Sequence, residues 1–199
     1  MRLGIYGGTF DPPHLGHLIL AEEARYQLNL DRILWLLTPV SPLKTDAVIS
    51  PLELRLELLE AALKNNPYFE VSRIDIDRPQ PHYAFESVKI LKDEYPGEQV
   101  VYLIGGDSLE DLPSWERPGE LAALCDQIGV MHRPGSPIDL DRLEKQVPGL
   151  TAKVVWVESP LFGISGRGIR KRLHAGGPVR YYLPGAVHQI IQEKGLYRE

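Results

Sequence analysis

The chain contains a single cysteine, Cys125, among its 199 residues. One thiol cannot form a disulfide within the chain, and it excludes a zinc site built from several cysteines. No apolar run approaches the ~20 residues that span a bilayer, and the first residues resemble a strand rather than a signal peptide. We therefore expect a cytoplasmic protein without membrane contact.

Positive charge is also scarce. The 22 lysines and arginines stand against 27 aspartates and glutamates, which gives a net charge of −5 and a pI near 5.7. A general nucleic-acid-binding protein usually has a basic excess, so no nucleic-acid partner is expected. An acidic protein that binds polyphosphates must gather its cations locally, and Arg167, Arg170, Lys171 and Arg172 form such a group.

Apolar, β-branched segments alternate with segments of helical periodicity. Strands are expected at 2–7, 32–38, 69–74, 99–104, 127–132 and 153–158. Helices are expected at 18–28, 51–65, 84–94, 119–125, 139–146, 165–174 and 184–194. This alternation predicts an α/β, Rossmann-like doubly wound fold, with a mainly parallel sheet and helices on both faces. The length fits one domain, residues 1–199, with the C-terminal helices (about 165–199) packed on it.

Local signals indicate where helices begin and where the longest loops lie. Ser50, Pro51 and Glu53 are typical of a cap, a first-turn proline and a capping-box acid. Asp11, followed by a proline, is likewise expected to cap a helix. The loops 75–83 and 107–118 both contain proline and aromatic residues, and we expect them to cover a pocket.

Two glycines and two histidines lie where the first strand leads into the first helix, in the segment Gly7-Gly8-Thr9-Phe10-Asp11-Pro12-Pro13-His14-Leu15-Gly16-His17. Ligands of open α/β sheets bind at such junctions, and glycines let the backbone approach a phosphate closely. His14 and His17 share one face of the first helical turn, where the helix dipole favours an anion. The segment therefore predicts a phosphate site. A zinc pair and two structural histidines remain the alternatives, but no suitably spaced third zinc ligand is near.

A second basic segment, 165–172, has the features of another phosphate site. Ser165 can cap a helix and leave N–H groups directed at phosphate oxygens. Arg167 and Arg170 are three residues apart, and Arg170 can bind a polyphosphate through two N–H groups. The alternative is an ordinary solvated basic face of a helix.

These segments resemble the HxGH nucleotidyltransferase superfamily, and most closely its bacterial nicotinate mononucleotide adenylyltransferases. The resemblance covers the chain from the first strand to the last residues. Five stretches carry it, in order: GGTFDPPHLGH at 7–17, the loop 39–44 that ends in Lys44, IGGD at 104–107 with LPSW at 112–115, ISGRGIR at 164–170, and YYLP at 181–184 with Leu196 and Tyr197 beyond it.

The resemblance implies adenylyl transfer from ATP to nicotinate mononucleotide, which gives nicotinate adenine dinucleotide and pyrophosphate in NAD biosynthesis. It also implies four catalytic residues. His14 and His17 would contact the ATP phosphates, with His17 nearest the α-phosphoryl group, and Lys44 and Arg170 would steady the β,γ-phosphates. The other implied ATP contacts are Gly7, Gly8, Thr9, Phe10, Gly16, Gly105, Asp107, Ile164, Ser165 and Arg167. The implied acceptor contacts are Tyr83, Ala84 and Trp115.

The chemistry that these residues allow is direct displacement, because neither a nucleophile–base pair nor a GxxxxGK[ST] loop is present. Mg²⁺ is expected as a cofactor held by ATP phosphates and water, since no cluster of carboxylates is visible in the sequence. For three of these residues a structural role remains an alternative to ligand contact. Lys44 fits an exposed loop lysine, Asp107 a helix cap and Trp115 a core residue. The sequence does not determine the oligomeric state, and a homo-oligomer is compatible with it.

The chain departs from the pattern of the family at three places. Leu43 stands where histidine is common, and Gly166 and Arg167 replace a serine and a small hydroxyl residue. The segment 82–87, HYAFES, stands where the family has SYTxDT, which helps to place the nicotinate end. Nicotinamide mononucleotide, another acceptor such as phosphopantetheine, and a nucleotide-binding module without catalysis therefore remain alternatives.

Overall fold

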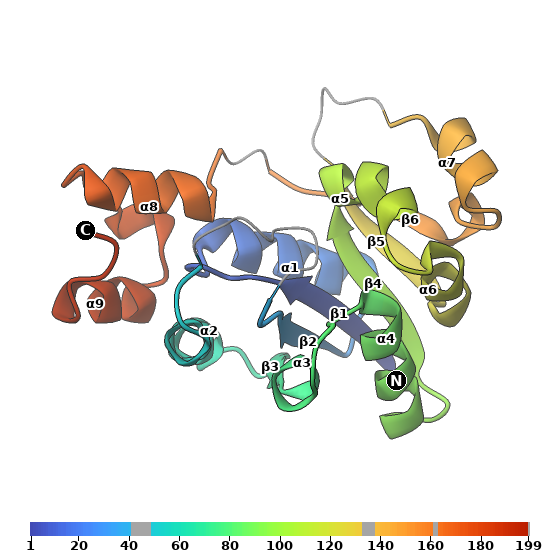
Figure 1. Ribbon diagram of the computed structural model, residues 1–199, viewed down its shortest axis with the longest axis horizontal. Coiled ribbons are helices and arrows are strands. Elements are labelled where there is room, and N and C mark those ends of the chain that lie inside the picture. The colour runs from blue at the N-terminus through green and yellow to red at the C-terminus, as the bar shows by residue number, and fades with distance from the viewer. Residues whose placement is uncertain (41–48, 133–137, 161–162, 199) are drawn as a thin grey trace.

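The structure is a computed structural model that describes residues 1–40, 49–132, 138–160 and 163–198. Within these residues, one sheet of six parallel strands has the order β3-β2-β1-β4-β5-β6 (Figure 1). The strands are β1 (Arg2–Gly8), β2 (Arg32–Leu37), β3 (Phe69–Ser72), β4 (Gln99–Gly105), β5 (Gln127–His132) and β6 (Val154–Glu158). All six predicted strands and the predicted parallel sheet are confirmed.

Helices connect the strands and continue after the last of them. The α-helices are α1 (Leu15–Gln27), α2 (Leu52–Leu63), α3 (Ile74–Asp77), α4 (Ala84–Glu94), α5 (Gly106–Asp111), α6 (Pro118–Leu124), α7 (Leu140–Gln146), α8 (Gly166–His174) and α9 (Gly185–Glu193). Short 3-10 turns are η1 (Leu112–Ser114), η2 (Thr151–Lys153) and η3 (Arg180–Tyr182). In the part of the chain that the structure describes, no helix is long and apolar enough to cross a membrane.

The sheet is buried on both faces because side chains alternate along each strand. On β2, Ile33 and Trp35 pack with residues of α1 and α2, whereas Leu34 and Leu36 pack with residues of α4 and α6. For this reason the strands are continuous apolar runs in the sequence. The predicted doubly wound arrangement, with helices on both faces, is confirmed.

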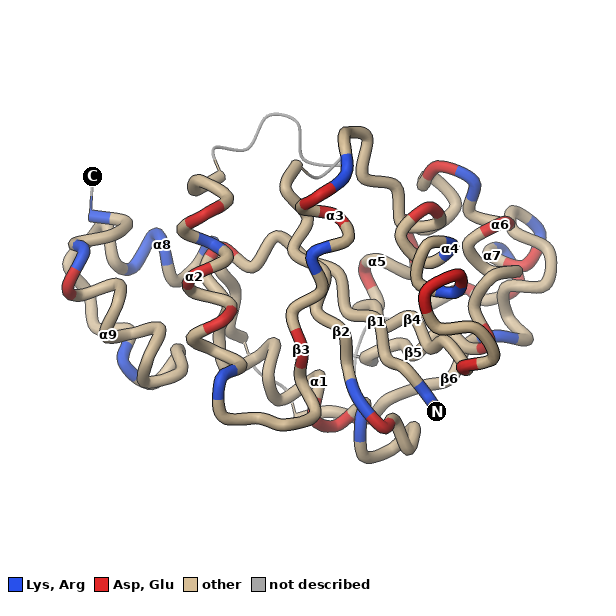
Figure 2. The backbone as a smooth tube through the Cα atoms, turned by 90° about the horizontal axis from the view of Figure 1, so that it is seen from below, with Lys and Arg blue, Asp and Glu red and all other residues tan. Residues whose placement is uncertain are grey.

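A third apolar cluster joins the C-terminal helices to the rest of the chain. Ile169 of α8 and Val187 and Ile191 of α9 are buried together with Leu58 of α2. Figures 1 and 2 show α8 and α9 beside α2 at one end of the molecule, with α6 and α7 at the other end. The predicted packing of the C-terminal helices thus depends on α2.

Two predicted helix caps are wrong. The N-cap of α2 is Pro51 rather than Ser50, and it makes no side-chain cap hydrogen bond. The N-cap of α1 is His14, while Asp11 lies three residues before it. Loop 75–83 also contains part of α3, and loop 107–118 contains most of α5 and all of η1. Proline and polar residues favoured loops there, but these short helices are stabilised by packing on the sheet.

Candidate active site

A cavity of about 680 Å³ lies at the carboxyl ends of β1 and β4. These neighbouring strands lead to helices on opposite faces of the sheet, and open α/β sheets bind ligands at this switch point. The residues that line the cavity come from β1, the start of α1, β4, α5, the residue after η1, β5, the segment after β6 and the start of α8. They are Tyr6, Gly7, His14, Gly16, His17, Leu20, Tyr102, Leu103, Ile104, Gly105, Gly106, Asp107, Ser108, Trp115, Met131, Ser159, Pro160, Gly163, Ile164, Ser165 and Gly166.

The two histidines stack at the start of α1. Their ring centroids are 3.6 Å apart and the ring planes differ by 17°. The backbone N–H of His14 donates to Nδ1 of His17 at 3.2 Å. In the neutral imidazole of His17 the proton therefore lies on Nε2, which makes that nitrogen a hydrogen-bond donor. The predicted shared face of the two histidines is confirmed.

Burial keeps the His14 ring neutral. Only 5% of the residue is exposed, and this desolvation lowers the pKa of His14 from 6.5 to about 4. At neutral pH the imidazole of His14 is therefore uncharged, with one nitrogen that can donate a hydrogen bond to a ligand and one that can accept. Its neutrality also spares the stacked pair the repulsion that two imidazolium rings would have.

Aromatic side chains support His17 from the core side. The ring of Phe10 meets the ring of His17 edge-on at a centroid distance of 5.1 Å, and Phe10 is 3% exposed. Phe10 does not line the cavity and therefore acts on it through His17. Gly8 serves the same packing, because a Cβ there would lie 2.8 Å from the Phe10 ring.

The start of α8 forms another part of the cavity wall. The side chain of Ser165 accepts a hydrogen bond from the N–H of Gly168 at 3.1 Å, so the predicted cap is confirmed. Ile164, Ser165 and Gly166 all line the cavity. The first N–H groups of a helix lack intrahelical partners, so the amino ends of α1 and α8 meet one cavity with partial positive charge.

The predicted basic residues that the structure describes do not line the cavity. Arg170 lies behind Gly166, with Nη1 3.5 Å from the position of a Cβ on that glycine, and it donates to the carbonyl of Asp11. Arg167 is exposed, and neither arginine lines the cavity. Lys44 and Leu43 lie outside the described residues.

The predicted acceptor residues divide into two groups. Trp115 lines the cavity, and its buried Nε1–H has no partner among the described residues. Tyr83 and Ala84 instead pack on the core cluster around α4 and do not line the cavity. Of the other predicted contacts, Gly7, Gly16, Gly105 and Asp107 line the cavity, whereas Thr9 does not.

The aromatic and apolar wall that β1, β4 and α1 supply was not predicted from the sequence. Tyr102 is the main example: it lines the cavity and meets Trp115 edge-on at 6.3 Å. Its hydroxyl lies 3.4 Å from the position of a Cβ on Gly7. The alternation along the predicted strand 99–104 could have placed Tyr102 and Ile104 on the same face, but gives no sign that a ligand lies there.

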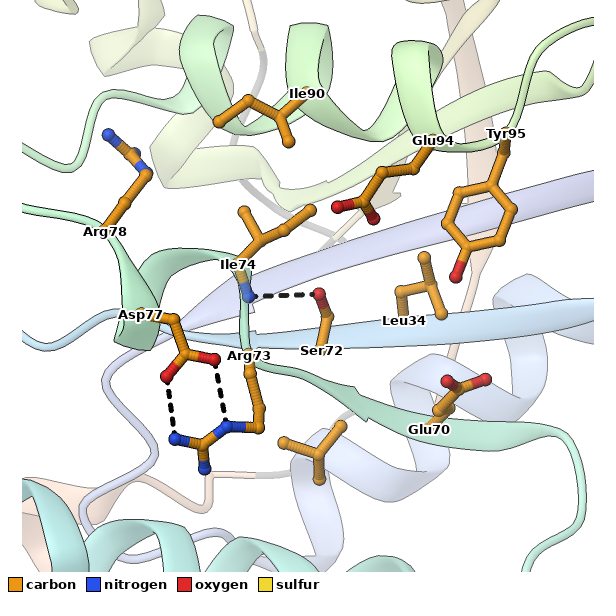
Figure 3. A pocket seen from close by; sticks show the side chains of 11 residues that line it. Leu34, Glu70, Ser72, Arg73, Ile74, Asp77, Arg78, Ile90, Glu94 and Tyr95 are labelled. Atoms are coloured by element: carbon orange, nitrogen blue, oxygen red, sulfur yellow. Dashed lines mark hydrogen bonds and ion pairs between the residues drawn. The ribbon is translucent and has the colours of Figure 1, made fainter.

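A second hollow, of about 450 Å³, lies at the β3 edge of the sheet between α3 and α4 (Figure 3). Arg73 and Asp77 on its rim form a two-pronged ion pair, with N–O distances of 2.7 and 3.1 Å. The backbone N–H of Ile74 is directed at Ser72. These groups satisfy one another, and no histidine is among the described residues that line this hollow. It is therefore a weaker candidate than the cavity at β1 and β4.

The chain matches the family described as cytidylyltransferase-like over residues 5–172. It is 43% identical to the probable nicotinate-nucleotide adenylyltransferase of Thermomicrobium roseum, over 99% of this chain and 92% of that protein. It is 38% identical to the nicotinate-nucleotide adenylyltransferase of Bacillus subtilis, over 98% of each.

Solved structures agree on the fold. The nicotinic acid mononucleotide adenylyltransferase of Plasmodium falciparum, complexed with NaAD, superposes with a TM-score of 0.79 and covers 98% of this chain and 97% of that one. The same protein complexed with APC gives a TM-score of 0.77. At 18% and 19% identity, these likenesses concern the fold alone.

Proposed function

Because this chain belongs to the cytidylyltransferase-like family, and its full-length relatives are nicotinate-nucleotide adenylyltransferases, we propose that it transfers the adenylyl group of ATP to nicotinate mononucleotide. The products are nicotinate adenine dinucleotide and pyrophosphate. The observation that carries the proposal is the cavity itself, which is lined both by the stacked pair His14 and His17 and by the amino end of α8.

The reaction needs no general base from the protein. The 5′-phosphate of the acceptor is already ionised and attacks the α-phosphorus of ATP in line, while pyrophosphate leaves. Catalysis then consists of holding the two nucleotides in line and stabilising the charge that develops on the phosphate oxygens. Two helix amino ends and two imidazoles are groups suited to that task.

His17 is the donor closest to the chemistry in this proposal. Its Nδ1 is occupied by the backbone of His14, so its Nε2–H donates to an oxygen of the α-phosphoryl group. His14 contacts a neighbouring phosphate oxygen and gains proton affinity when the anion binds, because the negative charge offsets the cost of burying an imidazolium. Arg170 and Lys44 steady the leaving pyrophosphate.

The acceptor occupies the side of the cavity near Trp115. The indole can stack on a pyridine ring, and its unpartnered Nε1–H is a donor for a polar group of the ligand. Tyr83 and Ala84 do not line the cavity and would act only through the core cluster on which they and Trp115 pack. The similarity to nicotinate-nucleotide adenylyltransferases supports nicotinate mononucleotide, rather than the nicotinamide form, as the acceptor. The assay below tests this preference.

Mg²⁺ is proposed as the cofactor. Among the described residues, no group of three or more histidine, cysteine, aspartate or glutamate side chains is placed to hold a metal, and Asp107 contributes one carboxylate to the cavity. This donor set fits an ion that arrives on the triphosphate. When bound, Mg²⁺ would neutralise charge on the phosphate oxygens.

The test offers the purified protein ATP and Mg²⁺ with nicotinate or nicotinamide mononucleotide in separate reactions. Mass spectrometry detects the dinucleotide and a coupled assay detects pyrophosphate, and EDTA should stop both. Dinucleotide formed mainly from the nicotinate form supports the proposal. Dinucleotide formed mainly from the amide form would overturn the proposed acceptor. ATP binding with no pyrophosphate released from ATP, whichever acceptor is offered, would overturn the proposed activity.

A further inference from the structure

Asp11 is a buried carboxylate at which three distant segments meet. It is 6% exposed, and its Oδ1 accepts a hydrogen bond from the hydroxyl of Tyr197 at 2.7 Å. Its Oδ2 accepts from the backbone N–H of Ser50 at 3.1 Å. Its carbonyl oxygen accepts from Nη1 of Arg170 at 2.5 Å. The loop before α1, the start of α2, helix α8 and the C-terminal segment are thus joined through one residue.

The contact with Arg170 is also ionic. Nη1 of Arg170 lies 3.8 Å from Oδ2 of Asp11, and the arginine side chain is about one-third exposed. Within the described residues, Nη1 is the only nitrogen of this guanidinium that has a hydrogen-bond partner. Nε and Nη2 are therefore available to a ligand while Nη1 fixes the direction of the group.

Tyr197 reaches Asp11 as a neutral donor. Burial and the hydrogen bond to the Asp11 carboxylate raise the pKa of Tyr197 well above its usual range. Tyr197 has a positive φ of 62°, which non-glycine residues rarely adopt, and surrounding contacts must hold it there. A hydroxyl directed at a buried carboxylate by such a backbone is a specific contact rather than incidental packing.

Gly166 allows helix α8 to approach Asp11. A Cβ at this position would lie 2.7 Å from the carbonyl oxygen of Asp11, closer than real Cβ contacts come. Gly166 also lines the cavity, and Arg170 lies about one turn further along the same helix. The glycine that departs from the second signature of the family therefore lets the start of α8 and Arg170 approach the loop that precedes His14.

We propose that Tyr197 and Asp11 are positioning residues that act through Arg170. The Tyr197 hydroxyl orients the Asp11 carboxylate, and Asp11 holds the Arg170 guanidinium through its carbonyl oxygen and its carboxylate, beside Gly166, which lines the cavity. A free arginine side chain loses much rotamer entropy when it binds a phosphate, and prior fixation reduces that loss. The inference rests on the proposed function, because it assigns the fixed guanidinium to the triphosphate of ATP.

The test is a double-mutant cycle with Tyr197→Phe, which removes the hydroxyl and keeps the ring. Alone, this change should raise the KM for ATP or lower kcat, by about 5- to 20-fold in kcat/KM for ATP, with the KM for the acceptor unchanged. In the Arg170→Ala background the same change should have an effect of less than about twofold, because its target is already gone. Tyr181→Phe is the matched control, since Tyr181 is 84% exposed.

Two results would overturn the inference. One is an unchanged kcat/KM for ATP in Tyr197→Phe. The other is a decrease in kcat/KM by the same factor whether or not Arg170 is present, which would indicate a general effect on folding. Calorimetric measurement of ATP binding to the same four proteins separates this inference from the proposed activity. If no acceptor gives product, a loss of ATP affinity that depends on Arg170 still supports the positioning role, and its absence overturns it.

Discussion

The backbone N–H of His14 donates to Nδ1 of His17 while the two rings stack 3.6 Å apart, so each histidine limits the orientation of the other. The ring of Phe10 meets His17 edge-on from the core side. The orientation of the His17 ring, and with it the direction of Nε2, is thus set before a ligand arrives. Such preorganisation is what stabilisation of a phosphoryl-transfer transition state requires.

Replacement of His17 by alanine should lower kcat by about 10²–10³-fold, the usual effect of removing one preorganised donor. The substitution leaves the backbone donor of His14 without its partner, so the melting temperature must be measured alongside the steady-state rate. His174→Ala is the control, because His174 is exposed at the end of α8. Activity of His17→Ala within a few-fold of the unaltered protein would contradict the proposed role.

The burial of His14 makes stability depend on pH. The pKa of His14 is about 4 in the fold against 6.5 in the unfolded chain, so the unfolded chain binds more protons between these values. Its free energy of unfolding should therefore rise with pH from about 4 to 6.5, by on the order of 3 kcal/mol from this residue, and level off above 6.5.

Urea unfolding at a series of pH values checks this dependence. His14→Gln keeps a polar side chain without a titration in this range, so its free energy of unfolding should change less between pH 4 and 6.5 than that of the unaltered protein. Equal pH dependence in the two proteins would show that burial of His14 is not its cause.

Gly166→Ala tests the close approach of α8 to Asp11. The added Cβ would meet a backbone oxygen, which cannot move aside as a side chain can, so we expect a loss of about 1–3 kcal/mol of stability. Displacement of α8 should also weaken the contact between Arg170 and Asp11 and raise the KM for ATP. Gly119→Ala on α6 is the control, because a Cβ there would have no atom of a described residue within 4 Å apart from its chain neighbours and its own helix backbone. Unchanged stability and KM in Gly166→Ala would contradict the assigned role of the glycine.

Tryptophan fluorescence reports on the acceptor side of the cavity. The chain has three tryptophans, of which Trp35 is fully buried and Trp156 is 39% exposed on β6. If the acceptor binds as proposed, nicotinate mononucleotide should quench Trp115, because its pyridine ring would stack on the indole. Quenching should be lost in Trp115→Phe and retained in Trp156→Phe. The reverse pattern would remove Trp115 from the acceptor site.

Much of this protein is determined by local patterns in its sequence. Continuous apolar runs such as Ile33–Leu37 need burial on both faces, and that need predicts parallel strands with helices on either side. The spacing of His14 and His17 predicts a shared face because helical geometry alone sets it. The cap formed by Ser165 is equally local, since donor and acceptor are three residues apart.

Only the tertiary structure decided the roles of Asp11, Phe10 and Tyr102. Asp11 is followed by proline, as a helix cap often is, but its partners Arg170 and Tyr197 lie 159 and 186 residues away, and no local pattern encodes contacts at such separations. Phe10 belongs to the segment that the sequence predicts to bind phosphate, yet it is buried because Gly8 leaves room for its ring. Tyr102 reaches the cavity because β4 lies beside β1, a pairing that forms only when the chain folds.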